Sequence, residues 1–207
     1  MATTPHPKTA NPDHDILDVI RARWSPRAFD AAREISAADL WRLFEAARWA
    51  PSSLNEQPWR FVVADRRRSP VAFAAQVATL TERNQAWASQ APILVIAAVK
   101  MTLERTGQMN RHAWYDAGQA VAFLTLQATA IGLSIRQMEG FDHTLARAAC
   151  GMPDTFEPAV VMAIGYEGDP DALTLERHRD QERQPRTRRK IDEFVFDGAW
   201  DRLLGTR

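Results

Sequence analysis

The sequence predicts an α+β domain in which helices flank a small sheet. Segments with apolar residues at helical spacing alternate with short β-branched runs typical of buried strands, and the helical segments cover more of the chain. The 207 residues, 45% of them hydrophobic, suffice for one domain with a substantial core. No internal repeat or Gly/Ser-rich linker divides the chain. A single domain over residues 14–207 is therefore expected.

The helices are predicted from apolar spacing and from residues that start or stop a helix. Ser36 with Asp39 resembles a capping box, and Pro51 stops that helix. The helix before Gly132 is apolar on both sides and should be central and buried. Ser69 and Pro70 open another. The expected helices cover roughly residues 13–23, 36–50, 70–80, 113–131 and 143–150.

Strands are predicted where short apolar runs lie between turn residues. The run over residues 92–99 is the most apolar, and we expect it to be buried. The last predicted strand, Ile191–Phe196, is isolated beyond a charged loop. Residues 1–13, rich in Pro, Thr and Ala, are expected to form a flexible tail. The expected strands cover residues 59–64, 92–99, 133–138, 159–166 and 191–196.

Composition excludes several classes of function. Lys plus Arg equals Asp plus Glu, 26 each, so no general affinity for nucleic acid or anionic membranes is indicated. Cys150 is the single cysteine, and no Cys or His pair has zinc-ligand spacing, so neither an intrachain disulfide nor a metal site is expected. The longest apolar run, over residues 91–99, is too short to span a bilayer, and the N-terminus lacks a signal-peptide core. A cytoplasmic protein is expected.

Missing motifs narrow the chemistry further. The chain has no G-x-S-x-G elbow, no H-E-x-x-H, no P-loop and no G-x-G-x-x-G after a strand. A phosphorylated cofactor would therefore need side chains for positive charge, because no Gly-rich backbone cradle is present.

Two segments have the composition of a binding site. Arg23 and Arg27 flank Ser25 directly after the first helix, and guanidinium groups with a hydroxyl can bind phosphate. On spacing alone, an ordinary charge pair at a helix end is favoured. The segment over residues 50–59, APSSLNEQPW, places hydroxyl and amide side chains in a turn suited to the edge of a flat heteroaromatic ring. A helix stop, a turn and a buried Trp would explain it equally.

Together, R-x-S-x-R-x-F and A-P-S-S-x-N-x-Q-P-W resemble the FMN-binding nitroreductase family. Asn84-Gln85, the DAGQA segment from Asp116, the MEGFD segment from Met138 and the RTRRKI segment from Arg186 follow in the family's order. The resemblance covers about residues 15–200. It implies a homodimer with FMN in the interface, a small central mixed sheet, and a C-terminal extension from about residue 175 whose strand crosses onto the partner subunit.

The resemblance also assigns residues. Arg23, Ser25 and Arg188 would hold the phosphate, with Arg186 or Arg189 assisting. Arg27 would lie near flavin N1 and O2, where a cation stabilises the negative charge of reduced flavin. The complete expected cofactor set is Arg23, Trp24, Ser25, Arg27, Pro51, Ser52, Ser53, Asn55, Asn84, Glu139, Gly140, Arg186, Arg188 and Arg189, with Ser52, Ser53 and Asn55 supplied by the partner.

The chain departs from the family at three positions. Trp24 and Trp87 stand where some members have a histidine and a cation, and Lys190 stands where proline is common. His112, Trp114 and Tyr115 are candidates for the substrate pocket, although an ordinary role at a helix start is equally expected of His112 and Tyr115. No side chain is assigned as a catalytic acid or base, because the flavin carries the chemistry.

The resemblance implies ping-pong transfer of hydride from NAD(P)H through flavin N5 to a small organic acceptor such as a nitroaromatic, quinone or enone. Alternatives with the same fold are a dehalogenase, a flavin-fragmenting enzyme, a small-aldehyde reductase and a non-catalytic flavin-binding protein. An interaction module that binds acidic partners through its arginine runs is the remaining class.

Overall fold

A four-stranded sheet forms the centre of the computed structural model, which describes residues 6–205. The strands are β1 (Trp59–Asp65), β2 (Ile93–Lys100), β3 (Ser134–Met138) and β4 (Phe156–Gly165), in the order β1-β2-β4-β3. The small central sheet is confirmed, but it is antiparallel at every pairing of these strands and not mixed. The β1–β2 connection turns back at the end of the sheet where Ile93 lies, the β3–β4 connection turns back toward the other end, and strand pairs connected in this way run antiparallel.

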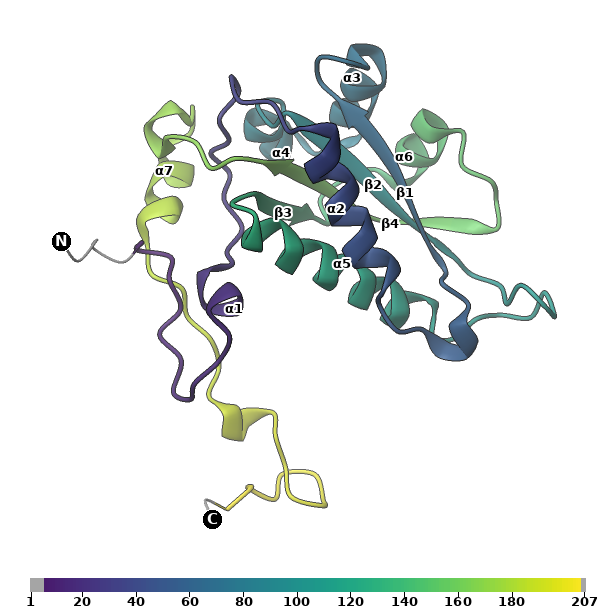
Figure 1. Ribbon diagram of the computed structural model, residues 1–207, viewed down its shortest axis with the longest axis vertical. Coiled ribbons are helices and arrows are strands. Elements are labelled where there is room, and N and C mark those ends of the chain that lie inside the picture. The colour runs from purple at the N-terminus through teal and green to yellow at the C-terminus, as the bar shows by residue number, and fades with distance from the viewer. Residues whose placement is uncertain (1–5, 206–207) are drawn as a thin grey trace.

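Helices cover both faces of the sheet (Figure 1). Along β2, Ile93, Val95, Ala97 and Val99 pack with α2 (Ala37–Arg48) and α5 (Ala113–Ala130). Leu94 and Ile96 belong to the opposite core, with α3 (Pro70–Thr79), α4 (Glu82–Ala88) and α6 (His143–Cys150). This two-sided burial explains why the β2 sequence is continuously apolar.

The predicted helix ends are largely confirmed. The Ser36 hydroxyl accepts the Asp39 backbone N–H at 3.0 Å and caps α2. Gly132, at φ +79°, lets the chain leave α5 for β3. The first helix is a correction: α1 is only Asp18–Ala22 and does not begin at residue 13. The preceding residues fold back, and the Ala10 N–H donates to the Arg21 carbonyl at 2.9 Å.

The segment that was expected to be a flexible tail is held against the body from His6 onward. The His6 imidazole lies 2.9 Å from the Glu167 carboxylate. Lys8 is buried and donates to the Gln181 carbonyl. Residues 6–10 are thus packed against the body, because this segment finds acceptors far along the chain. Residues 1–5 lie outside the described part.

The C-terminal part contains α7 (Glu176–Arg183) and then an arm, residues 184–205, that leaves the body (Figure 1). The strand predicted at Ile191–Phe196 is not formed within the single chain. A 3-10 turn occupies Ile191–Glu193, and Phe196 makes one isolated bridge with Leu203. Apart from this bridge, no strand among the described residues of this chain lies beside the segment, so its pairing into a sheet would need another chain.

Candidate functional site

Arg23 is the centre of a cluster of cations. Its guanidinium donates to the Ser25 hydroxyl at 2.9 Å. Arg186 comes from the C-terminal arm and donates to the Arg23 carbonyl, and to the Arg21 carbonyl at 2.7 Å. Burial and the charges of Arg186 and Arg188 lower the pKa of Arg23. Segments at the two ends of the chain therefore bring like charges together, which favours an anion at this place.

One buried donor in this cluster is unused. The Nε atom of Arg186 is inaccessible to solvent and has no hydrogen-bond partner among the described residues. Its two other nitrogens are occupied by backbone carbonyls. A phosphate oxygen would satisfy such a donor, so the cluster fits a phosphate group. Arg189, also predicted for this site, is exposed on the arm.

Arg27 lies against a buried carboxylate that sequence reasoning did not identify. Glu182 of α7 accepts the Arg27 backbone N–H at 2.9 Å and lies 3.5 Å from its guanidinium. Burial, the largest cause, lowers the pKa of Arg27, and Glu182 opposes this. Arg27 therefore remains a fixed cation in the loop that follows Arg23.

Two more cations lie near Arg27. Arg136 of β3 donates to the Ser25 carbonyl at 2.5 Å, and its guanidinium lies 5.4 Å from the centre of the Trp87 ring. Burial lowers the pKa of Arg136 to about 10, and Arg27 contributes to this. Arg136 and Lys8 were missed because each lies alone in sequence, and only the β3 register and the returning N-terminal segment bring them here.

Trp24, expected at the cofactor site, has an occupied side chain. Its indole N–H donates to Glu167 at 3.1 Å, and the His6 ring lies 5.2 Å away. The Trp24 side chain thus packs against the segment that contains His6 and Lys8.

Asn84 and Gly140, both candidate cofactor residues, lie in contact. The Asn84 side-chain amide donates to the Gly140 carbonyl at 3.0 Å, and the Thr81 backbone N–H donates to the same oxygen at 3.0 Å. These contacts join the start of α4 to the loop after β3. Glu139, the neighbouring candidate, is exposed.

The turn after α2 has a constrained backbone. Leu54 and Asn55 have φ of 55° and 57°, in a region that non-glycine residues rarely adopt. The buried Asp116 carboxylate accepts the Ser53 backbone N–H at 3.0 Å. The turn carries Pro51, Ser52, Ser53 and Asn55, and Asp116 fixes it to the first turn of α5.

The two groups of candidates do not meet within one chain. Figure 1 shows the segment between α2 and β1 at the opposite end of α5 from α1, which leads into Arg23. The 18 residues of α5 correspond to about 27 Å of helix. One flavin contacting both groups would require a second copy of the chain.

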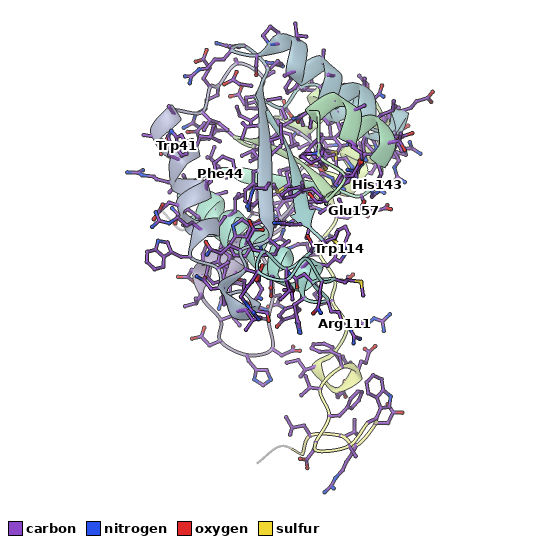
Figure 2. All side chains as sticks on the ribbon, turned by 90° about the vertical axis from the view of Figure 1, so that its right-hand side faces the viewer. Trp41, Phe44, Arg111, Trp114, His143 and Glu157 are labelled. Atoms are coloured by element: carbon purple, nitrogen blue, oxygen red, sulfur yellow. The ribbon has the colours of Figure 1, made fainter. Side chains whose placement is uncertain are left out.

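The substrate-pocket candidates lie at the start of α5. His112 borders a pocket of about 450 Å³ next to the constrained turn. Trp114 and Tyr115 are 47% and 70% exposed, and Figure 2 shows Trp114 and Arg111 on the side of the body away from Trp41. The residues that line this pocket are Ser53, Leu54, Leu103, Met109, Asn110, Arg111 and His112.

Residues 6–205 lack two other features, a cluster of metal ligands and a membrane-spanning helix. The His, Cys, Asp and Glu side chains of this part form no group of three or more that could hold a metal ion. Its helices include none with the length and apolar character needed to cross a membrane.

Comparison with known proteins identifies relatives over most of the chain. The model of the nitroreductase family matches residues 20–166. An uncharacterized 15.4 kDa protein of Mycolicibacterium smegmatis is 35% identical over 151 residues, which are 70% of this chain and 99% of that protein. The oxygen-insensitive NAD(P)H nitroreductase of Salmonella typhimurium is 32% identical over 199 residues, 76% of this chain and 91% of that protein.

Among solved structures, an oxidoreductase containing FMN is similar with a TM-score of 0.85 and 27% identity. The similarity covers 96% of this chain and 98% of that one. The span that the family model matches includes Arg23, Arg27, Asn84, Gly140 and the constrained turn, and it ends before the arm.

Proposed function

The chain belongs to the nitroreductase family, and on that premise we propose that it is an NAD(P)H-dependent oxidoreductase that binds FMN between two copies of itself. The observation that carries the proposal is the cluster of Arg23, Ser25 and Arg186, in which like charges and an unused buried donor converge. A phosphate monoester supplies the missing negative charge and acceptor oxygens. The side chains present therefore fit FMN.

The rest of one half-site would serve the ring of the cofactor. Arg27 would supply a fixed positive charge at the edge where reduced flavin becomes negative. Asn84 and the backbone of Glu139 and Gly140 would form its polar boundary, because their mutual hydrogen bond fixes both segments. Ser52, Ser53 and Asn55 would come from the partner subunit, since the same chain holds them at the far end of α5.

When bound, FMN supplies hydride transfer from NAD(P)H to an organic acceptor such as a nitroaromatic, quinone or enone. The protein binds the phosphate, orients the ring and fixes charges around it. His112, Trp114 and Tyr115 would line the entrance used in turn by reductant and acceptor, as a ping-pong scheme requires. We assign no proton transfer to a side chain.

The test is to identify the cofactor and then to follow its reduction. The purified protein should be yellow, and heat should release FMN and not FAD, as chromatography of the released flavin would show. Under anaerobic conditions NADH or NADPH should bleach the bound flavin, and a nitroaromatic or quinone should restore the colour. A colourless protein would refute the proposal. Bound flavin that neither nucleotide reduces would indicate a flavin-binding protein without turnover.

A further inference from the structure

Glu182 is a buried acidic residue at the end of the candidate site that holds Arg23 and Arg27. It is 3% exposed, on the strongly polar helix α7, where His178 is the only other buried residue. One carboxylate oxygen accepts the Arg27 N–H at 2.9 Å, and the Ala28 N–H points to it from 3.4 Å. The other oxygen lies 3.5 Å from the Arg27 guanidinium. The carboxylate thus contacts both backbone and side chain of Arg27.

This carboxylate is outnumbered by the cations around it. The negative charge of Glu182 raises the pKa values of Lys8, Arg27 and Arg136. Burial lowers the same three pKa values and is the larger effect. Arg83 and Arg177 also lower the pKa of Arg27. Lys8, Arg27 and Arg136 alone are three cations around one carboxylate, which leaves two positive charges in excess. A buried excess of this kind can stabilise a second anion.

Arg27 depends on Glu182 for its position. The loop that carries it follows the five-residue helix α1 and is itself neither helix nor extended strand. Its N–H donates to the carboxylate, so Glu182 supplies a hydrogen bond that regular secondary structure would otherwise provide.

We propose that Glu182 is a positioning residue with two effects: it holds Arg27 at the flavin site, and its charge limits how strongly the surrounding cations favour reduced flavin. The inference rests on the proposed function. It predicts that the reduction potential is set by the balance between one carboxylate and several cations. With an effective dielectric of about 20, a unit charge within roughly 12 Å changes such an equilibrium by about tenfold.

Two variants separate the two effects. Glu182→Gln keeps an oxygen that can accept the Arg27 N–H but removes the charge, so the flavin potential should become more positive. The expected tenfold change in preference for reduced flavin corresponds to about 30 mV for a two-electron couple. Glu182→Asp keeps the charge but is shorter by one methylene, so the Arg27 amide should exchange faster and the potential should not become more positive than that of the wild type. Glu176→Gln, on the exposed face of α7, is the matched control for both.

Potentials are measured on the flavin-loaded protein against a reference dye, and exchange of the Arg27 amide is measured by NMR on the protein freed of flavin. A Glu182→Gln potential equal to wild type, or more negative, would overturn the electrostatic effect. Wild-type exchange in Glu182→Asp would overturn the positioning effect, and this measurement remains decisive if Glu182→Gln fails to fold. A wild-type protein without flavin would instead refute the proposed function, and amide exchange would still decide whether Glu182 holds Arg27.

Discussion

The side-chain amide of Asn84 donates to the backbone carbonyl of Gly140 at 3.0 Å, and this contact joins two candidate flavin segments that are far apart in sequence. The contact also explains why residue 140 is a glycine. A Cβ atom there would lie 2.9 Å from the Asn84 amide nitrogen and 3.2 Å from the Thr81 hydroxyl. The requirement is for space, because Gly140 is not among the residues with positive φ.

Gly140→Ala should therefore displace Asn84 and weaken FMN binding. We expect a loss of about 1–2 kcal/mol in stability, within the usual range for a crowded site, and at least a tenfold weaker affinity. Thermal unfolding measures the loss of stability, and fluorescence titration of the apoprotein with FMN measures the affinity. In the double variant Asn84→Ala/Gly140→Ala the stability should recover while the affinity stays low. Wild-type affinity in Gly140→Ala would remove this loop from the flavin site.

The phosphate assignment predicts that removing Arg23 weakens FMN binding without destabilising the free protein. Charge-assisted hydrogen bonds contribute about 1.5–3 kcal/mol each, so Arg23→Ala should weaken FMN binding by roughly one to two decades. Because Arg186 and Arg188 repel Arg23, the apoprotein should not lose stability. Inorganic phosphate should raise the Tm of wild-type apoprotein and have a smaller effect on the variant.

Arg23→Lys is the matched variant, since it keeps the charge and loses the paired geometry of the guanidinium; its affinity should be intermediate. Equal FMN affinity in wild type and Arg23→Ala would refute the phosphate assignment.

Apolar patterns in the sequence predict most of the helices and strands, but they do not reveal helices that are almost entirely polar. The apolar runs of β2 and α5 predict both elements within a residue or two. Helix α7 was missed because only His178 and Glu182 of it are buried, and no apolar periodicity can show that. Residues 13–17 have helix-like spacing, but the N-terminal segment folds back on Arg21 and replaces the expected helical turns.

The candidate site was predictable where motifs are contiguous. Arg23, Ser25 and Asn84 could be chosen because each lies in a recognisable segment. Glu182, Arg136 and Lys8 come from separate elements, and only tertiary packing places their charges together. The local sequence of each is that of an ordinary surface residue.

His178 should make the stability of the protein depend on pH. Its side chain is 1% exposed, and its Nε2 atom has no hydrogen-bond partner in the described chain. Burial, followed by the charges of Arg27, Arg177, Arg83 and Arg136, lowers the pKa of His178 to about 4. The folded protein therefore holds a neutral imidazole over a range where the unfolded chain is protonated.

A lowered histidine pKa means that the unfolded state binds more protons between about pH 4 and 6.5, so stability falls as pH decreases through that range. By pH 5 the loss should approach an upper limit of about 2 kcal/mol, or roughly 4–8 °C in Tm. His178→Asn should be less stable at neutral pH but should have a flatter profile, whereas His143→Asn, an exposed control, should keep the wild-type slope. Parallel profiles for wild type and His178→Asn would contradict this account.

The arm beyond Lys190 should be required for the dimer. In the single chain it exposes apolar side chains to water: Phe194, Trp200 and Leu203 are 59%, 84% and 64% exposed. Figure 2 shows the arm projecting away from the body and from Trp41 and Phe44 on α2. Exposed apolar surface of this extent is typical of an interface. We therefore expect a second copy of the chain to cover it.

Truncation after Lys190 tests this role without disturbing the cluster, because Arg186, Arg188 and the whole of α7 remain. Truncation after Thr174 is less informative, since it also removes the buried His178 and Glu182. We expect the chain truncated after Lys190 to be a monomer. Its FMN affinity should fall, because Ser52, Ser53 and Asn55 would no longer reach the flavin of a partner subunit. Analytical ultracentrifugation at the flavin absorbance follows mass and cofactor together. A truncated protein that remains dimeric and fully yellow would show that the arm performs neither role, and a monomer that keeps its FMN would place the whole flavin site within one chain.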